Sequence, residues 1–278
     1  MTPSEPRASH IAFIGGGNMA RCLIGALVHG GTPPAAIAVA EPHPELRAAL
    51  ARDFGVAVHD GPAAAAAGAD VLVLAVKPQI MKTVCAELAA GLASRRPLVI
   101  SIAAGIRIAQ LRDWLGADLP IVRSMPNTPA LVGAGATGLI ANDTTSPEQR
   151  AQAEAILGAA GMTAWLERED LMDTVTALSG SGPAYFFLLV EALEDAAVAQ
   201  GLPRETARAL ATQTCLGAGR MLVENGEPPT VLRERVTSPG GTTAAALQTF
   251  IDGHLRDLVA SAVEAATRRG RELSEQYS

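Results

Sequence analysis

Aromatic residues are scarce in this chain: Phe, Trp and Tyr together make up 3% of its 278 residues. Helices must therefore pack closely through small side chains such as Ala and Gly, rather than around large rings. The sequence also lacks a clustered basic face, and its net charge is −6. Because nucleic acids and anionic membrane surfaces are bound through such a face, the composition argues against either partner.

Cysteine is rarer still, with three residues. Cys22, Cys85 and Cys215 are widely separated and form no CxxC pair, which argues against redox or zinc chemistry and favours a reduced, cytoplasmic compartment. The five histidines are also scattered, and none forms a pair with metal-ligand spacing: His10, His29, His43, His59 and His254. We therefore expect no metal site.

Long apolar runs are missing as well. The longest, Ala184 to Val190, meets Glu191 well before the roughly 20 apolar residues that a membrane span needs. The first ten residues, MTPSEPRASH, lack the basic start and apolar run of a secretory signal, and we expect a short disordered tail.

What the chain has is apolar content sufficient for folding: 49% of its residues are hydrophobic and 18% are charged. Since single cores stop growing near ~250 to 300 residues, we expect two domains, residues 1–168 and 169–278. Expected strands of the first domain are 11–14, 37–40, 71–76, 98–102, 121–124 and an edge strand at 162–166; expected helices are 19–29, 44–52, 79–92, 108–115 and 147–160, the last capped by Ser146. Apolar strands alternating with helices predict a doubly wound α/β domain with a parallel sheet.

The second domain is expected to be entirely helical, with helices over 182–200, 203–225, 230–236, 242–251 and 255–274. The helix that starts near Pro183 is apolar almost all round, and such a helix must be buried on every side. A domain of about a hundred residues could hardly bury it alone, so we expect a second subunit to cover it.

The first strand is followed directly by a glycine motif. The sequence IAFIGGGNMA places Gly15, Gly17 and Ala20 in a GxGxxA pattern between a strand and a helix. Gly15 would allow the tight turn, and Gly17 would let the backbone approach a pyrophosphate at the helix N-terminus. The alternative is a plain strand-to-helix turn.

Cofactor choice should be set after the second strand. Glu41 could accept hydrogen bonds from both adenosine ribose hydroxyls and would repel a 2'-phosphate, which favours NADH. Alternatively Glu41 faces solvent, and His43 or a nearby Arg admits NADPH. Lys77, at the end of another strand, is expected to contact the dinucleotide or else to be an ordinary surface lysine.

Six motifs carry a family resemblance: FIGGGNMA, AVKPQ, SIAAG, RSMPNTPA, TALSGSGPAY and TSPGGTT. In their order and spacing they resemble pyrroline-5-carboxylate reductases from about His10 to Leu273. The resemblance implies a Rossmann-type N-terminal domain, an all-α C-terminal dimerisation domain, a homodimer and larger rings up to a decamer. It also implies hydride transfer from NADPH or NADH to the C=N bond of 1-pyrroline-5-carboxylate, giving L-proline in the last step of proline biosynthesis.

The resemblance further implies site residues. Expected cofactor contacts are Ile14, Gly15, Gly16, Gly17, Asn18, Met19, Glu41, Ala75, Val76, Lys77, Pro78, Ala103, Ala104 and Asn127. Expected substrate contacts are Glu169, Ser238, Gly240, Gly241, Thr242 and Thr243, with Thr243 as the catalytic group that hydrogen-bonds the ring nitrogen.

Alternatives remain for several of these residues. The SPGGTT segment could be a plain helix-breaking turn, and Glu169 could be a first-turn acid that stabilises a helix dipole. Ser179, Ser181 and Pro183 are expected to shape the start of the buried helix, with Ser181 as its cap. A 3-hydroxyacid dehydrogenase would need a lysine in the helical domain, but the chain has only Lys77 and Lys82. A non-catalytic dinucleotide sensor would bind cofactor without turnover.

Overall fold

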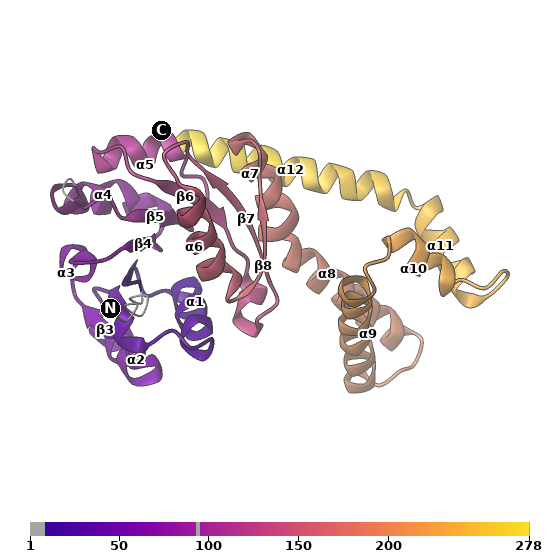
Figure 1. Cartoon of the computed structure of the whole chain (residues 1–278). Helices are drawn as coiled ribbons and strands as arrows, with labels where there is room; N and C mark the ends of the chain where they lie inside the picture. The colour runs from indigo at the N-terminus through magenta and orange to yellow at the C-terminus, as the bar shows by residue number, and fades with distance from the viewer. Residues whose placement is uncertain (1–8, 93–94, 278) are drawn as a thin grey trace, which may run out of the picture. The chain divides into compact units, whose positions relative to one another are not determined.

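The computed structural model describes residues 9–92 and 95–277, coloured along the chain in Figure 1. Residues 1–8, which make up most of the expected N-terminal tail, lie outside the described residues. The chain divides into two compact units, Met1–Gly180 with Ala266–Ser278 and Ser181–Ala265. This division differs from the boundary expected at residue 168, because the segment 169–180 and the end of the last helix pack with the first unit.

The first unit is built on an eight-stranded sheet in the order β3-β2-β1-β4-β5-β6-β7-β8. The strands are β1 (Ile11–Ile14), β2 (Ile37–Ala40), β3 (Ala57–His59), β4 (Val71–Leu74), β5 (Leu98–Ser101), β6 (Ile121–Met125), β7 (Gly135–Ala141) and β8 (Gly161–Trp165). Neighbours run parallel except β6 and β7, which pair antiparallel. The chain order reverses between β1 and β4, which is where ligands of such sheets bind.

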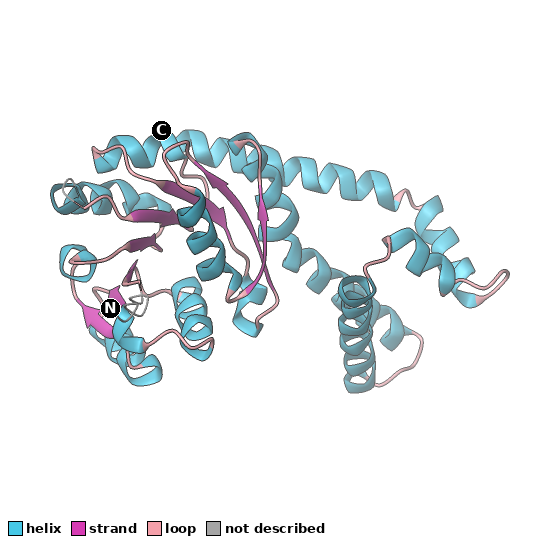
Figure 2. Ribbon diagram, in the orientation of Figure 1, coloured by secondary structure: helices cyan, strands magenta, loops and turns pink. Residues whose placement is uncertain are grey.

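Helices of this unit connect strands that follow one another in the chain, and a short helix follows the last strand, β8 (Figures 1 and 2). They are α1 (Asn18–His29), α2 (Pro44–Phe54), α3 (Pro62–Ala66), α4 (Pro78–Leu92), α5 (Ile108–Leu115), α6 (Pro147–Gly158) and α7 (Met172–Val175). Short 3-10 turns lie at Pro34–Ala36, Thr128–Val132 and Glu169–Leu171, and a π-helical turn lies at Thr176–Gly180.

Successive residues of each buried strand enter two different cores. On β1, Phe13 packs in one cluster with Ile24 of α1, whereas Ile14 packs in the other with Met81 of α4. The alternation follows from strand geometry, in which neighbouring side chains point to opposite faces. Helices thus cover both faces of the sheet, and the predicted doubly wound α/β fold is confirmed.

Two strands escaped the sequence analysis, β3 and β7. β3 has three residues and is partly exposed, while β7 carries Gly135 and Gly138, which weaken a strand pattern. A Cβ on Gly138 would lie 2.7 Å from Cγ1 of Val175, so glycine lets α7 approach the sheet. β4 and β5 also end earlier than expected, at Leu74 and Ser101.

Helix starts show one correct and one wrong capping prediction. The Ser146 hydroxyl accepts a hydrogen bond from the Gln149 amide at 3.2 Å, and Pro147 is the first residue of α6, as predicted. Ser181 precedes α8 (Gly182–Ala199), but its side chain makes no capping hydrogen bond, so the prediction of Ser181 as a cap is wrong. Pro183 is the second residue of α8. Proline has no N–H group, and the first turn of a helix provides no intrahelical acceptor for one, so proline is tolerated there.

The second unit, described throughout from Ser181 to Ala265, contains helices and no strand, as predicted (Figure 2). It holds α8, α9 (Arg204–Asn225), α10 (Pro229–Arg235), α11 (Thr242–Asp252) and the first half of α12 (Leu255–Gln276). Buried Glu194 of α8 accepts hydrogen bonds from Arg204 and Arg208 of α9, at 3.1 Å and 3.0 Å. The acid thereby ties the two helices together.

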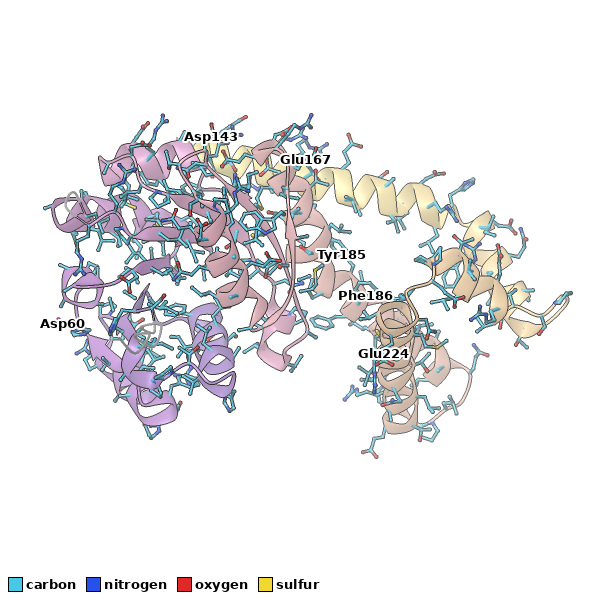
Figure 3. The ribbon with its side chains drawn as sticks, in the orientation of Figure 1. Asp60, Asp143, Glu167, Tyr185, Phe186 and Glu224 are labelled. Atoms are coloured by element: carbon cyan, nitrogen blue, oxygen red, sulfur yellow. The ribbon has the colours of Figure 1, made fainter. Side chains whose placement is uncertain are left out.

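Large apolar side chains of α8 are exposed in the single chain. Phe186 and Phe187 are 61% and 68% exposed, and Leu188 is 65% exposed. Figure 3 labels Tyr185 and Phe186 on this helix. Monomeric proteins rarely leave such a run uncovered.

Candidate active site

The turn between β1 and α1 requires glycine at its first position. Gly15 has φ +104°, and a Cβ there would lie 2.6 Å from the carbonyl oxygen of Ala75. The backbone therefore passes directly over the end of β4. Main-chain hydrogen bonds from Gly15 to Ala40 and from Ala75 to Ile14, both 2.8 Å, lock the turn between three strand ends.

The start of α1 is open to a ligand. A Cβ on Gly17 would meet nothing within 4 Å, and Gly17 supplies no side chain to cap the helix that begins at Asn18. The first N–H groups of a helix lack intrahelical acceptors and attract anions. This geometry suits a pyrophosphate on the helix start.

Glu41 lies at the end of β2 against this turn. It is 5% exposed; its Oε2 accepts a hydrogen bond from the Gly16 N–H at 3.0 Å, and its Oε1 accepts one from the His43 N–H at 3.0 Å. The alternative that Glu41 faces solvent is therefore wrong. Arg47, which the sequence analysis did not single out, donates to the carbonyl oxygens of Glu41 and Pro42 at 2.8 Å and 2.7 Å.

The other residues expected to hold the cofactor follow the carboxyl ends of neighbouring parallel strands. Ile14 ends β1, and Asn18 and Met19 begin α1; Ala75, Val76 and Lys77 follow β4, with Pro78 starting α4; Ala103 and Ala104 follow β5. The sheet order thus brings these segments to one edge. Lys77 is exposed there.

Asn127 follows β6, and its side chain is fully engaged within the first unit. Its Nδ2 donates to the carbonyl oxygen of Ser179 at 2.9 Å, and its Oδ1 accepts from the Ala136 N–H at 2.8 Å. The residue is 8% exposed. Asn127 therefore holds the turn before α8 against the start of β7.

Glu169 has partners that neither sequence-based reading foresaw. Its Oε1 accepts from Nη1 of Arg123 at 3.0 Å and from the N–H of Ile108, the first residue of α5, at 2.9 Å. Arg123 lies in β6 and is 3% exposed. Glu169 therefore neutralises a buried arginine and satisfies an amide at the start of α5. A charged residue inside an apolar strand was the overlooked signal.

In the second unit, Val236 to Gly241 connect α10 to α11. Gly240 has φ +71°, and the Gly241 N–H donates to the carbonyl oxygen of Ser238 at 3.0 Å. α11 begins at Thr242 behind Gly241, which provides no side-chain cap. Ser238 and Thr242 are exposed, and Thr243 is half-buried. The segment ends one helix before the next begins, as a helix-breaking turn does. It also leaves amides at the start of α11 without a side-chain cap, as a substrate-binding loop would, so the geometry is compatible with both alternatives.

A bidentate ion pair immediately precedes this loop in the chain. Both guanidinium nitrogens Nη1 and Nη2 of Arg235, the last residue of α10, donate to the two carboxylate oxygens of Glu227, at 2.8 Å and 2.7 Å. Bidentate pairs of this kind fix geometry better than single contacts do. The pair ties the last residue of α10 to Glu227, which lies in the segment before that helix.

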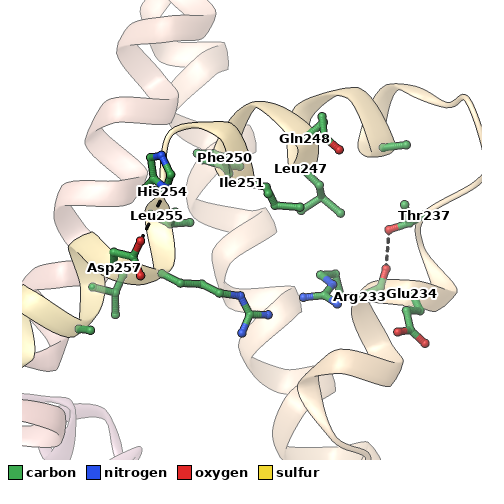
Figure 4. A pocket seen from close by; sticks show the side chains of 14 residues that line it. Arg233, Glu234, Thr237, Leu247, Gln248, Phe250, Ile251, His254, Leu255 and Asp257 are labelled. Atoms are coloured by element: carbon green, nitrogen blue, oxygen red, sulfur yellow. Dashed lines mark hydrogen bonds and ion pairs between the residues drawn. The ribbon is translucent and has the colours of Figure 1, made fainter.

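A cavity of about 1080 Å³ lies within the second unit, among α10, α11 and the start of α12 (Figure 4). Its wall is largely apolar, with Leu247, Phe250, Ile251 and Leu255 among the residues labelled in Figure 4. At its rim, Nδ1 of His254 and Oδ2 of Asp257 are 3.6 Å apart.

Residues 9–92 and 95–277 contain no group of three or more His, Cys, Asp or Glu side chains that could hold a metal ion. Within the same residues, no helix has the length and apolar character needed to cross a bilayer.

A doubly wound sheet with an open glycine turn, followed by a helical unit, defines the class of nicotinamide-dinucleotide-dependent oxidoreductases with a Rossmann-type domain. Two family models match: NADP oxidoreductase coenzyme F420-dependent over residues 10–105, and pyrroline-5-carboxylate reductase dimerisation over residues 169–273. The pyrroline-5-carboxylate reductase of Pseudomonas aeruginosa is 51% identical over 273 residues, 98% of each chain. The chain belongs to the pyrroline-5-carboxylate reductase family.

Other pyrroline-5-carboxylate reductases are similar to this chain over nearly their whole length. The reductase of Escherichia coli is 40% identical over 95% of this chain and 98% of its own. Among solved structures, the reductase of Coxiella burnetii superposes with TM-score 0.93 at 45% identity, covering 96% of this chain and 99% of that one. The Plasmodium falciparum reductase with NADP bound has TM-score 0.83 at 30% identity, covering 97% and 100%. The family resemblance expected from the six motifs is confirmed.

Proposed function

We propose that this protein reduces 1-pyrroline-5-carboxylate to L-proline with hydride from NADPH or NADH, the last step of proline biosynthesis. The observation that carries the proposal is the start of α11, which follows two glycines and has no side-chain cap. Open helix-start amides suit a small carboxylate, and the relatives aligned over the whole chain are reductases of this substrate.

The first unit binds the dinucleotide. The open amides at the start of α1 hold the pyrophosphate, and the space beside Gly17 lets it approach the backbone. Glu41, held by the Gly16 and His43 amides, meets the adenosine ribose. When bound, the nicotinamide supplies a hydride; the protein supplies binding, orientation and electrostatics.

The second unit binds the substrate. Amides of Gly240 and Thr242 bind its carboxylate, and Ser238 and Gly241, joined by a main-chain hydrogen bond of 3.0 Å, shape the same loop. The Thr243 hydroxyl donates a hydrogen bond to the ring nitrogen. This bond makes the nitrogen withdraw electrons more strongly from the carbon that receives the hydride. Because an imine accepts hydride readily once its nitrogen is hydrogen-bonded or protonated, positioning supplies most of the catalysis.

The working form is a cytoplasmic homodimer, and dimers assemble further into a decamer. Support comes from the dimerisation family model over residues 169–273 and from the exposed apolar side chains of α8. The largely apolar cavity of Figure 4 supplies a further surface that a second subunit would cover.

The test is a steady-state assay of purified protein. Oxidation of NADH and of NADPH is followed at 340 nm with 1-pyrroline-5-carboxylate, and product is identified as proline by chromatography. Acyclic keto acids serve as the control substrates. Turnover with the cyclic imine alone is the expected result; equal or greater turnover with a keto acid, or dinucleotide binding without turnover, overturns the proposal.

A further inference from the structure

Tyr277, which follows the last residue of α12, makes three contacts in the first unit. Its Oη accepts a hydrogen bond from Nε2 of Gln79 at 3.0 Å, and its carbonyl oxygen accepts one from Nε2 of Gln110 at 2.7 Å. A Cβ built on Gly105 would lie 3.5 Å from the Tyr277 ring, so the ring packs on that glycine. The residue also joins one of the two hydrophobic cores.

These contacts fall at the edge of the sheet where the dinucleotide is proposed to bind. Gln79 is the second residue of α4 and stands two residues after Lys77. Gly105, with φ +78°, directly follows Ala103 and Ala104. The Tyr277 side chain thus bridges the start of α4, which follows the β4 segment, and the loop after β5.

Gln110 extends the bridge to a third element. It is the third residue of α5, and its Oε1 accepts a hydrogen bond from the Arg107 N–H at 2.7 Å, while its Nε2 reaches Tyr277. The side-chain oxygen and nitrogen of Gln110 therefore each make a hydrogen bond. The β5–α5 loop is held between the start of α5 on one side and the Tyr277 ring on the other.

We propose that Tyr277 is a positioning residue for dinucleotide binding: it sets the distance between the start of α4, directly after the β4 segment, and the loop after β5, both at the proposed dinucleotide crevice. The inference rests on the proposed cofactor site. Loops carry binding residues but are intrinsically mobile, and a misplaced loop weakens every contact it makes. A hydrogen bond that fixes the start of α4 relative to the loop after β5, through Tyr277, therefore acts on affinity for the dinucleotide rather than on the chemical step.

The test measures dinucleotide affinity directly, by fluorescence of NADPH and NADH titrated with protein, so it needs no substrate. Tyr277→Phe keeps the ring on Gly105 and removes only the hydroxyl, and Gln79→Ala removes the same bond from the other side. Each is expected to raise the dissociation constant about three- to tenfold, the effect of one net hydrogen bond. The double variant should be no worse than either single one, because both delete one interaction.

Two further measurements separate positioning from general stability. Glu272→Gln, which breaks the exposed 2.8 Å pair with Arg269 on the same end of α12, is the matched control and should leave affinity unchanged. In turnover assays Tyr277→Phe should raise KM for the dinucleotide and leave kcat unchanged. Unaltered affinity in Tyr277→Phe, or a lower melting temperature alone, overturns the inference while leaving the proposed reaction intact. If the unsubstituted protein binds neither dinucleotide, both this inference and the proposed function are refuted.

Discussion

The Glu41 carboxylate accepts a hydrogen bond from the backbone N–H of Gly16, with Oε2 and the nitrogen 3.0 Å apart. The middle residue of the glycine turn is thereby tied to the end of β2. A Cβ on Gly16 would lie 3.2 Å from the same oxygen and 2.6 Å from Cδ1 of Leu50, so the close approach requires glycine. A negative charge is consequently fixed where the adenosine ribose is proposed to lie.

Glu41 should determine the choice between the two dinucleotides. A fixed carboxylate repels a 2'-phosphate, so we expect NADH to be favoured in the unsubstituted protein. Glu41→Ser should raise the ratio of kcat/KM for NADPH to that for NADH about tenfold or more, equivalent to about 1.4 kcal/mol. Glu41→Gln keeps the size and an acceptor for the Gly16 amide but lacks the charge, and should shift the ratio in the same direction. An unchanged ratio in both variants contradicts this role.

The glycines of the turn should respond differently to a methyl group. Gly17→Ala meets nothing within 4 Å and should leave the free energy of unfolding within about 0.5 kcal/mol, while weakening dinucleotide binding about tenfold or more. Gly15→Ala is the contrasting variant: at φ +104° and 2.6 Å from the Ala75 carbonyl, it should cost about 1–3 kcal/mol of stability. Thermal unfolding and dinucleotide titration check both; tight binding by Gly17→Ala would refute the pyrophosphate site.

Thr243 should matter for turnover. Thr243→Ala removes the hydroxyl proposed to bond the ring nitrogen, and should lower kcat about tenfold or more, since one positioned hydrogen bond is worth about 1–3 kcal/mol. Thr243→Ser keeps the hydroxyl and should retain most of the activity. Steady-state kinetics with both parameters unchanged in Thr243→Ala would remove the residue from the mechanism.

Glu169 should contribute to stability through Arg123. Glu169→Ala leaves the buried guanidinium and the Ile108 amide without this acceptor, and should lower the free energy of unfolding by about 1–3 kcal/mol. The matched control is Glu167→Ala, an exposed acid two residues earlier in the chain. Denaturant unfolding of the two variants compares them, and equal midpoints contradict the structural role.

Cys85 should make stability fall at high pH. Burial in α4 raises the pKa of its thiol from 9.0 to about 12. Between these values the unfolded chain ionises and the folded one does not, so the free energy of unfolding declines as pH rises from 9 toward 12. Unfolding at pH 8 and at pH 10.5 should show a smaller decline for Cys85→Ala than for the unsubstituted protein. Parallel declines would contradict a buried, neutral thiol.

Local sequence patterns were sufficient for much of the fold and one half of the site. Strands such as Ile11–Ile14 are apolar throughout and lie between helices with clear starts, so the parallel sheet was readable without long-range information. The glycine turn was readable for the same reason, since its chemistry lies in consecutive residues. β7 was not, because its glycines are explained by Val175 and Ala160, which approach from elsewhere in the chain.

The amino-acid sequence by itself determined the doubly wound sheet, the helical second unit and the glycine-bearing turns, because each depends on residues near one another in the chain. Tertiary structure alone decided that Glu169 meets Arg123 and that Tyr277 meets Gln79, pairs separated by 46 and 198 residues. No periodicity connects such positions. Their contacts arise only when the sheet brings the ends of β4, β5 and β6 to one edge.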